Sequence, residues 1–138
     1  MSADAQVSEL RLVVTADDWD AAVRFYRDEF GLEQVADFSS PDGRVVLLSA
    51  GRATLEIIDV AQAEFIDQVE VGRRVAGPIR VAFEVRDTAA ATDALGAAGA
   101  SVLAPPTRTP WGSSNSRMDA PGGLQLTLFQ ELGEPSAG

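Results

Sequence analysis

Carboxylates and guanidiniums are the groups in this sequence that could carry chemistry. The 138 residues contain no histidine and no cysteine. This composition removes the commonest metal ligand, the commonest general base near neutral pH, and any thiolate nucleophile or disulfide. Acid–base chemistry therefore depends on acidic, basic or tyrosine side chains, and a metal ion would need a shell of oxygen ligands.

Several of these charged residues fall within predicted β-strands. Side chains alternate along a strand, so residues two apart share one face. In each such strand one face is apolar and the other is mixed, which is typical of a sheet with helices on one side and a cleft or solvent on the other. The mixed faces carry our candidate ligand-binding residues, Arg11, Glu56, Arg80, Glu84, Thr127 and Phe129.

The charges on these mixed faces allow two interpretations. An arginine fork can hold a ligand carboxylate and a glutamate can hold an amine, so the four charged residues could recognise a ligand. Alternatively, Arg11 pairs with Glu56, and Arg80 pairs with Glu84 or Glu56, and the charges only neutralise one another.

The predicted elements that position these residues follow the order β-α-β-β-β. A strand at Leu10–Thr15 precedes a helix, which Asp17 or Asp18 can cap and Gly31 ends. The helix has one apolar face, formed by Trp19, Ala22, Val23, Tyr26 and Phe30. Turn residues then separate three predicted strands, Gln34–Ser40, Val45–Ser49 and Ala53–Asp59.

The same order returns in the second half of the chain. A strand at Ile79–Val85 precedes a helix that Asp87 can cap and that runs through Ala98. Three strands follow, with a turn at Pro105-Pro106 after the first of them: Ser101–Ala104, Ser114–Met118 and Leu124–Phe129. The halves match residue by residue, since Arg11-Leu12-Val13 corresponds to Arg80-Val81-Ala82 and Leu55-Glu56-Ile57 to Leu126-Thr127-Leu128. Such a repeat predicts two copies of one unit, each covering the sheet of the other.

We therefore expect residues 1–138 to form a single domain, with module one at about 9–60 and module two at about 78–131. Residues 61–77 are polar and acidic and are predicted to be a connector with some helix. The tail, 132–138, is expected to lack regular structure.

Charge and hydropathy narrow the classes of partner. The formal net charge of −10 would repel a phosphate backbone, so we expect no nucleic-acid binding. No apolar run approaches the length needed to span a bilayer, so we expect no membrane contact. Residues 1–9 lack the features of a signal peptide, which makes the cytoplasm the expected location.

Three sequence segments resemble the glyoxalase/bleomycin-resistance/extradiol-dioxygenase superfamily, also called vicinal oxygen chelate. These are the run from Leu12 to Leu32 with its Phe25-Tyr26 and Gly31-Leu32 pairs, the run Val81–Asp87, and Pro110-Trp111-Gly112 followed by Arg117-Met118-Asp119. The resemblance implies an α+β fold in which two tandem βαβββ modules form a curved mixed sheet around a cleft. It also implies a homodimer.

The resemblance places metal ligands of the family on the first and last strands of each module. The matching positions here are Arg11, Glu56, Arg80 and Thr127, of which only Glu56 keeps a ligand type. Two guanidiniums would repel a divalent cation. We therefore expect no metal and no cofactor.

The resemblance also implies a role for aromatic residues. In resistance-like members an aromatic side chain near Trp111 walls the drug cleft, and a flat ring stacks on planar ligands. Phe38 and Phe129 are further lining candidates. The alternative is that Trp111 packs under its own loop and that the two phenylalanines belong to the core.

The first functional hypothesis is that the protein binds a small organic molecule in a metal-free cleft. Sequestration of an antibiotic would be one such function. The alternative is a metal-independent isomerase, epimerase or lyase, with Glu56 as the base and Arg11 or Arg80 stabilising an enolate. Two neighbouring arginines are expected to lower the pKa of Glu56, which disfavours that alternative. A divalent-metal lyase or dioxygenase is the least favoured hypothesis.

Overall fold

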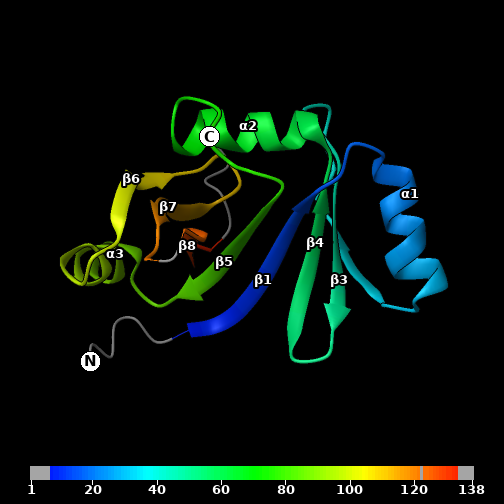
Figure 1. Ribbon diagram of the computed structural model, residues 1–138, viewed down its shortest axis with the longest axis horizontal. Coiled ribbons are helices and arrows are strands. Elements are labelled where there is room, and N and C mark those ends of the chain that lie inside the picture. The colour runs from blue at the N-terminus through cyan, green and yellow to red at the C-terminus, as the bar shows by residue number, and fades with distance from the viewer. Residues whose placement is uncertain (1–6, 122, 134–138) are drawn as a thin grey trace.

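Two βαβββ modules share one eight-stranded sheet in the computed structural model, which describes residues 7–121 and 123–133 (Figure 1). The strand order is β2-β3-β4-β1-β5-β8-β7-β6, and β1 pairs with β4, and β5 with β8, in parallel. Most of the tail that was predicted to be irregular lies outside the described residues. The elements of module one are β1 (Val7–Thr15), α1 (Trp19–Val23), the π-helical segment η2 (Arg24–Glu29), β2 (Gln34–Asp37), β3 (Val45–Ala50) and β4 (Ala53–Ile58). After α2 (Val60–Glu70) come β5 (Ile79–Val85), α3 (Thr88–Ala97), β6 (Ser101–Arg108), β7 (Ser113–Asp119) and β8 (Gln125–Glu131).

The two modules meet at the antiparallel pair β1–β5. Leu12 lies opposite Val81, which is its counterpart in the sequence repeat. Arg11 pairs with Ala82, and Val13 pairs with Arg80. Replacing each residue of the first pair by its counterpart in the repeat gives the second pair. The duplication predicted from the sequence is therefore an approximate two-fold relation, and the predicted α+β class with its curved sheet is confirmed.

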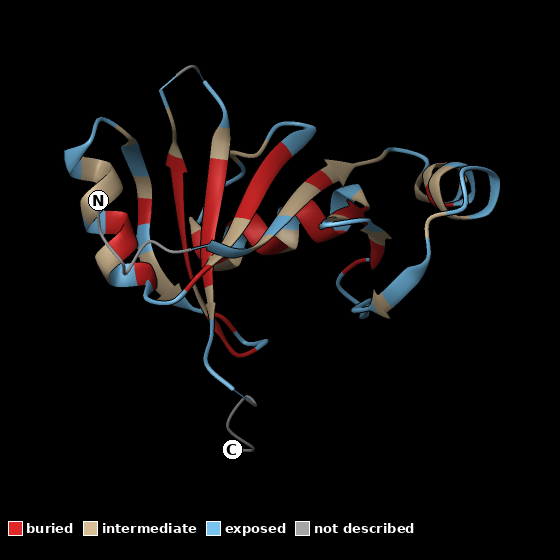
Figure 2. Cartoon of the chain, turned by 90° about the horizontal axis from the view of Figure 1, so that it is seen from below, coloured by how far each residue is buried: buried red, intermediate tan, exposed pale blue. Residues whose placement is uncertain are grey.

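Each module buries a core between its first helix and the sheet. In module one, Trp19, Ala22 and Tyr26 pack against the cluster that contains Ile57 and Leu48. In module two, Ala91 and Leu95 of α3 pack against Met118 and Leu128. Figure 2 shows these buried segments in the strands and on the inner sides of the helices.

The connector is more ordered than the sequence predicted. It forms the 11-residue helix α2, capped by Asp59, whose side chain accepts a hydrogen bond from the Gln62 N–H at 2.8 Å. Figure 1 shows α2 lying across one end of both half-sheets. A third core cluster joins α2 to the central strands and contains Val13, Val45, Ile58, Ala63, Ile66, Ala82 and Phe129.

The prediction that Phe30 lies on the apolar face of the first helix is wrong, since its side chain is 70% exposed. The last turns are π-helical, with the Phe30 N–H donating to the Phe25 carbonyl at 2.9 Å. Each π turn takes up more residues than an α turn, so the residue that continues the 3.6-residue period rotates away from the sheet.

The predicted turn at Pro105-Pro106 is also wrong, because β6 runs through both prolines. β6 is one of the two edge strands of the sheet, and its outer side pairs with no other strand of the sheet. A proline there can place its missing N–H on the outer side without removing a hydrogen bond between strands. Register shifts against β7 on either side of Ala104 accommodate the prolines.

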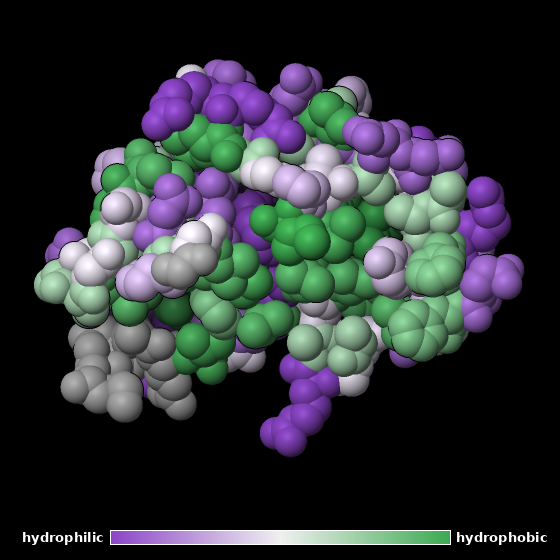
Figure 3. All heavy atoms as spheres, in the orientation of Figure 1, coloured by the Kyte–Doolittle hydropathy of each residue, from purple (hydrophilic) through white to green (hydrophobic). Residues whose placement is uncertain are grey.

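The surface retains apolar side chains. They gather across the middle of the face shown in Figure 3, and on the central strands Val7, Leu10 and Ile79 are exposed. The homodimer expected from the sequence stays a prediction. No helix in the described ranges is long and apolar enough to cross a membrane.

Candidate functional site

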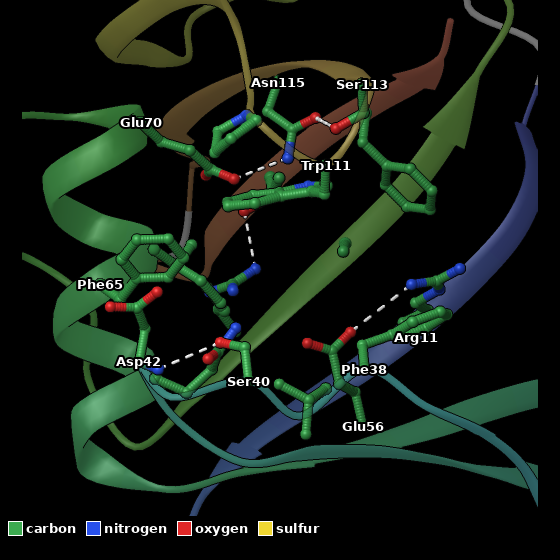
Figure 4. A pocket seen from close by; sticks show the side chains of 18 of the residues that line it. Arg11, Phe38, Ser40, Asp42, Glu56, Phe65, Glu70, Trp111, Ser113 and Asn115 are labelled. Atoms are coloured by element: carbon green, nitrogen blue, oxygen red, sulfur yellow. Dashed lines mark hydrogen bonds and ion pairs between the residues drawn. The ribbon is translucent and has the colours of Figure 1, made fainter. Parts of the chain in front are cut away.

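A cavity of about 400 Å³ lies between the central strands and helix α2 (Figure 4). We call it the cleft cavity. Strands β1, β4, β5 and β8 supply one side and α2 the other. Residues of β3 and β7 and of the segments 38–42 and 110–111 add to the wall. Seven of the eight candidate site residues line it: Arg11, Phe38, Glu56, Arg80, Trp111, Thr127 and Phe129.

Strand register explains why these residues meet. Val13 of β1 lies between Glu56 of β4 and Arg80 of β5. One pair of residues further along, Ala82 of β5 lies between Arg11 of β1 and Thr127 of β8. Residues paired in register point to the same side of a sheet, so the small apolar Ala82 lines the cavity among these polar side chains. Val13, on the same face, belongs to the core cluster that joins the sheet to α2.

Arg11 is held by carboxylates of its own module. Its Nε and Nη2 donate to Glu9 at 2.9 and 3.3 Å, and its Nη1 lies 3.7 Å from Glu56 Oε1. The guanidinium lies over the ring of Phe129, 4.8 Å from the ring centroid. Burial acts to lower the pKa of Arg11, but Glu9 and Glu56 outweigh it and raise that pKa. The pairing of Arg11 with Glu56 that the sequence left open is present, and Glu9, two residues away on the same strand face, was missed.

Arg80 has a different environment. It is only 5% exposed, and its Nη1 donates to the Thr127 hydroxyl at 2.8 Å. Among the described residues no carboxylate lies within ion-pair distance of Arg80, so the alternative pairing with Glu84 or Glu56 is not formed. Burial lowers the pKa of Arg80 and Arg117 lowers it further, against the opposing charges of Glu70 and Glu56. A guanidinium remains protonated in proteins, so the cleft cavity contains a buried positive charge that no carboxylate of the described ranges contacts.

The expectation that two arginines lower the pKa of Glu56 is wrong. Glu56 is 8% exposed, and burial raises the pKa of its carboxyl although Arg80 and Arg11 act in the opposite direction. Neither arginine makes a close hydrogen bond with Glu56, because Arg11 is engaged by Glu9 and Arg80 by Thr127. Desolvation therefore dominates.

Glu84 is the candidate residue that the structure places elsewhere. It lies opposite Glu9 in the β1–β5 pairing and borders a separate hollow with Val7, Ser8 and Gln130. It shares the strand face of Arg80, but four residues along a strand correspond to about 13 Å. Face alternation identifies which side of a sheet a residue occupies, and it does not set the extent of a cavity along the strand.

A buried polar network fixes α2 to the second module, and the sequence did not reveal it. Arg117 of β7 has no exposed surface and donates to Asp67 at 2.8 Å and to Glu70 at 2.7 Å. Asn115 donates to the other oxygen of Glu70 at 2.6 Å and accepts from Ser113 at 2.6 Å. Figure 4 shows Glu70, Asn115 and Ser113 together at one end of the cleft cavity. The only available signal was the Arg117-Met118-Asp119 motif, which carried no information about its partners.

Aromatic side chains form the outer wall. Trp111 is 39% exposed and lies beside Phe65 of α2, with ring centroids 5.9 Å apart. Phe38 is 57% exposed at the opposite side, near Arg11 in Figure 4. Phe129 is buried and belongs both to the cavity lining and to the core. Phe65 was missed by sequence reasoning because its helix was interpreted as a connector.

The residues at the four family ligand positions do not fit a divalent cation. Two of them are the guanidiniums of Arg11 and Arg80, and Thr127 is engaged by Arg80. Within the described part of the chain, no three acidic side chains converge as metal ligands would. We therefore derive no chemistry through a metal at this site.

Solved structures with the same fold include two methylmalonyl-CoA epimerases. The enzyme from Mycobacterium tuberculosis is 20% identical with a TM-score of 0.65, and the match covers 95% of this chain and 93% of that one. A Streptomyces coelicolor variant in complex with 2-nitronate-propionyl-CoA is 21% identical with a TM-score of 0.64, over 91% and 99% of the chains. A protein from Vibrio splendidus, described as a glyoxalase/bleomycin resistance protein/dioxygenase superfamily member, is 13% identical with a TM-score of 0.62. The match covers 91% of this chain and 100% of that one. At these identities the likeness shows the fold alone.

Among proteins with curated descriptions, none matches this chain in sequence. The sequence profile of a protein family, in contrast, matches residues 10–128, from the first strand to the last. That match, with the duplicated βαβββ arrangement around a cavity, shows that the chain belongs to the Glyoxalase/Bleomycin resistance protein/Dioxygenase superfamily.

Proposed function

We propose that this protein binds a small organic molecule in the cleft cavity without the help of a metal ion. The cavity volume of about 400 Å³ falls within the range of small-molecule sites. Its lining combines apolar and aromatic side chains with polar groups that include two guanidiniums and four carboxyls. Apolar surface with polar groups that fix the orientation of a ligand is typical of such sites.

The environment of Arg80 is the observation that carries this proposal. A buried charge is costly unless it is paired, and the chain satisfies that rule at Arg117, which contacts two carboxylates. Arg80 is almost as deeply buried, yet its described hydrogen bond goes to a neutral hydroxyl. Ionisable groups in a cavity whose pKa is shifted by burial, as that of Arg80 is, are concentrated at functional sites.

Isothermal titration in the presence of a chelator tests the proposal. The ligand panel comprises bleomycin-type and other aromatic antibiotics together with small aromatic acids, amines and neutral compounds. We expect saturable binding of at least one compound at one site per chain, and its loss or strong weakening in Arg80→Met. The exposed Arg52 provides a matched control, and Arg52→Met should bind like the wild type. Absence of saturable binding across the whole panel would contradict the proposal, and binding of an antibiotic would favour sequestration.

A second candidate function, a metal-independent epimerase or isomerase, is favoured by the raised pKa of Glu56. A buried carboxyl with such a pKa is suited to accept a proton, and Arg80, on β5 across the intervening strand β1, could stabilise the developing enolate. The fold shared with methylmalonyl-CoA epimerases is consistent with this candidate. Exchange of the hydrogen next to the carbonyl of small acids and thioesters, followed by NMR in D₂O, tests it. Exchange that persists in Glu56→Gln at the rate of the exposed control Glu64→Gln would exclude Glu56 as the base.

A further inference from the structure

Two arginines at equivalent positions of the repeat have different partners in the two modules. Arg11 corresponds to Arg80, and Glu56 corresponds to Thr127, because Val13 pairs with Glu56 as Ala82 pairs with Thr127. In module one the arginine therefore faces a carboxylate at 3.7 Å, and in module two it faces a hydroxyl at 2.8 Å. Arg11 has a second carboxylate in Glu9, whereas the residue opposite Glu9 in the β1–β5 pairing, Glu84, lies outside the cleft cavity.

We propose that the ligand of the cleft cavity is a small monocarboxylic acid with a flat aromatic body, whose carboxylate binds Arg80 beside Thr127. This inference rests on the proposed function and specifies the class of ligand. A guanidinium fork binds a carboxylate through two parallel hydrogen bonds, and the Thr127 hydroxyl can donate a third once Arg80 turns to the ligand. In the low dielectric of a buried site such charge-assisted bonds are the strong ones.

The charges around the cleft cavity limit the ligand to one negative charge. The basic side chains that line it are Arg11 and Arg80, and Arg11 is already engaged by Glu9. Four carboxyl groups also line it: Asp42, Glu56, Glu70 and Glu131. Asp42 and Glu131 are exposed, so a second carboxylate or a phosphate at the mouth would meet negative charge. This arrangement disfavours a CoA thioester, which carries several phosphate charges outside the acyl site.

The aromatic wall selects the body of the ligand. Trp111 and Phe65 lie side by side, and Ala82 and Val45 add small apolar side chains to the interior surface. Trp111 is partly exposed, so a planar ligand that stacks on it would also remove apolar surface from water. An aromatic ring attached directly to a carboxylate can therefore contact the wall while its charge reaches Arg80.

The first test compares matched ligands on the wild-type protein by isothermal titration at neutral pH with chelator. The probes are naphthalene-2-carboxylate, its neutral carboxamide, naphthalene-2,6-dicarboxylate and benzoyl-CoA. We expect the monocarboxylate to bind about tenfold or more tightly than the carboxamide, since a hydrogen-bonded charge is lost in the amide. We also expect it to bind more tightly than the dicarboxylate and the thioester. Equal affinity for acid and amide, or tighter binding of either polyanion, would overturn the inference.

The second test uses the repeat itself. Thr127→Glu places in module two the carboxylate that module one has at Glu56. This side chain should form an ion pair with Arg80 and so abolish binding of the acid. Thr127→Gln has nearly the same size without the charge and should retain a measurable preference for acid over amide. Circular dichroism and thermal melting establish that both variants fold, and the ligand comparison on the wild type decides the inference if either does not. Equal loss in both variants, with both folded, would contradict the role of charge.

Failure of this inference and failure of the proposed function are distinguishable. If a neutral or cationic compound of the wider panel binds at one site and the aromatic acids do not, the ligand class is wrong and the cavity still binds a ligand. If no compound of either panel binds, both proposals fail.

Discussion

Arg11 and Arg80 occupy equivalent positions in the two modules, yet of these two arginines only Arg11 contacts carboxylates of the described residues. Arg11 donates to Glu9 at 2.9 Å, whereas the described hydrogen bond of Arg80 goes to the Thr127 hydroxyl. The sheet around them is symmetric, since each arginine lies beside a small apolar residue of the other module's first strand. The asymmetry therefore arises from side chains and not from the backbone.

This difference predicts opposite effects of two arginine substitutions on stability. Arg80→Met removes a buried charge that no carboxylate in the described part of the chain contacts, so the free energy of unfolding should stay the same or increase. Arg117→Met leaves Asp67 and Glu70 buried without their cation and should lower the free energy of unfolding by about 3–5 kcal/mol. Urea denaturation followed by circular dichroism measures both. A large loss of stability in Arg80→Met would show that its charge supports Glu56 or Glu70 in the folded state.

Glu56 should make stability decrease as pH rises. Its pKa in the folded protein lies above the ordinary value of 4.5, so the folded state holds the proton more tightly than the unfolded chain. The resulting stabilisation is complete below about pH 4.5 and is lost as pH rises through the folded-state pKa. Glu56→Gln has no such proton, so its stability relative to the wild type should improve over that pH window. Denaturation midpoints from acid to neutral pH test this, and parallel curves for the two proteins would contradict it.

Asp67 should have the opposite pH dependence. Burial acts to raise its pKa, but hydrogen bonds from the Ala76 N–H, Arg117 and the Val75 N–H outweigh burial and lower that pKa below 3.8. Its contribution to stability is therefore present above pH 3.8 and is lost as pH falls through the folded-state pKa. Asp67→Asn should be less stable at neutral pH and should lose less stability on acidification. The exposed Asp17→Asn is the matched control, and it should follow the wild type.

Trp111 should report ligand binding by fluorescence. The chain has two tryptophans. Trp19 packs against the core of module one, and its Nε1 donates a hydrogen bond to the Ile57 carbonyl at 3.0 Å. In a Trp19→Phe background we expect a saturable change of Trp111 emission on adding naphthalene-2-carboxylate. Trp111→Ala should weaken binding by about tenfold, as loss of one stacked aromatic contact implies. Unchanged affinity in Trp111→Ala would mean that this ring packs on Phe65 without touching the ligand.

Local patterns in the sequence were sufficient for much of the fold. Alternation placed Arg11, Glu56, Arg80 and Thr127 on one face, and the repeat predicted two modules of the same element order. The structure joins these modules edge to edge through β1 and β5 in one sheet. Strand periodicity can be read from residues close in sequence, and the duplication can be read by comparing the two halves of the chain. The lack of histidine and cysteine likewise leaves carboxyl, guanidinium, hydroxyl and aromatic groups as the chemistry that this chain can offer a ligand.

Only the tertiary structure decided the charge balance of the site. The partner of Arg80 is Thr127, 47 positions away in the sequence. Strand register and the lengths of the surrounding side chains decide that this hydroxyl, and not a carboxylate, contacts the guanidinium. The placement of α2 over the cleft cavity, and its attachment through Arg117 to Asp67 and Glu70, joins segments about 50 residues apart without any local pattern. The pKa of Glu56 rose because burial outweighs two neighbouring cations. Burial is a property of the assembled molecule, so the sequence determined which charges were available and the packing decided which of them lack a partner.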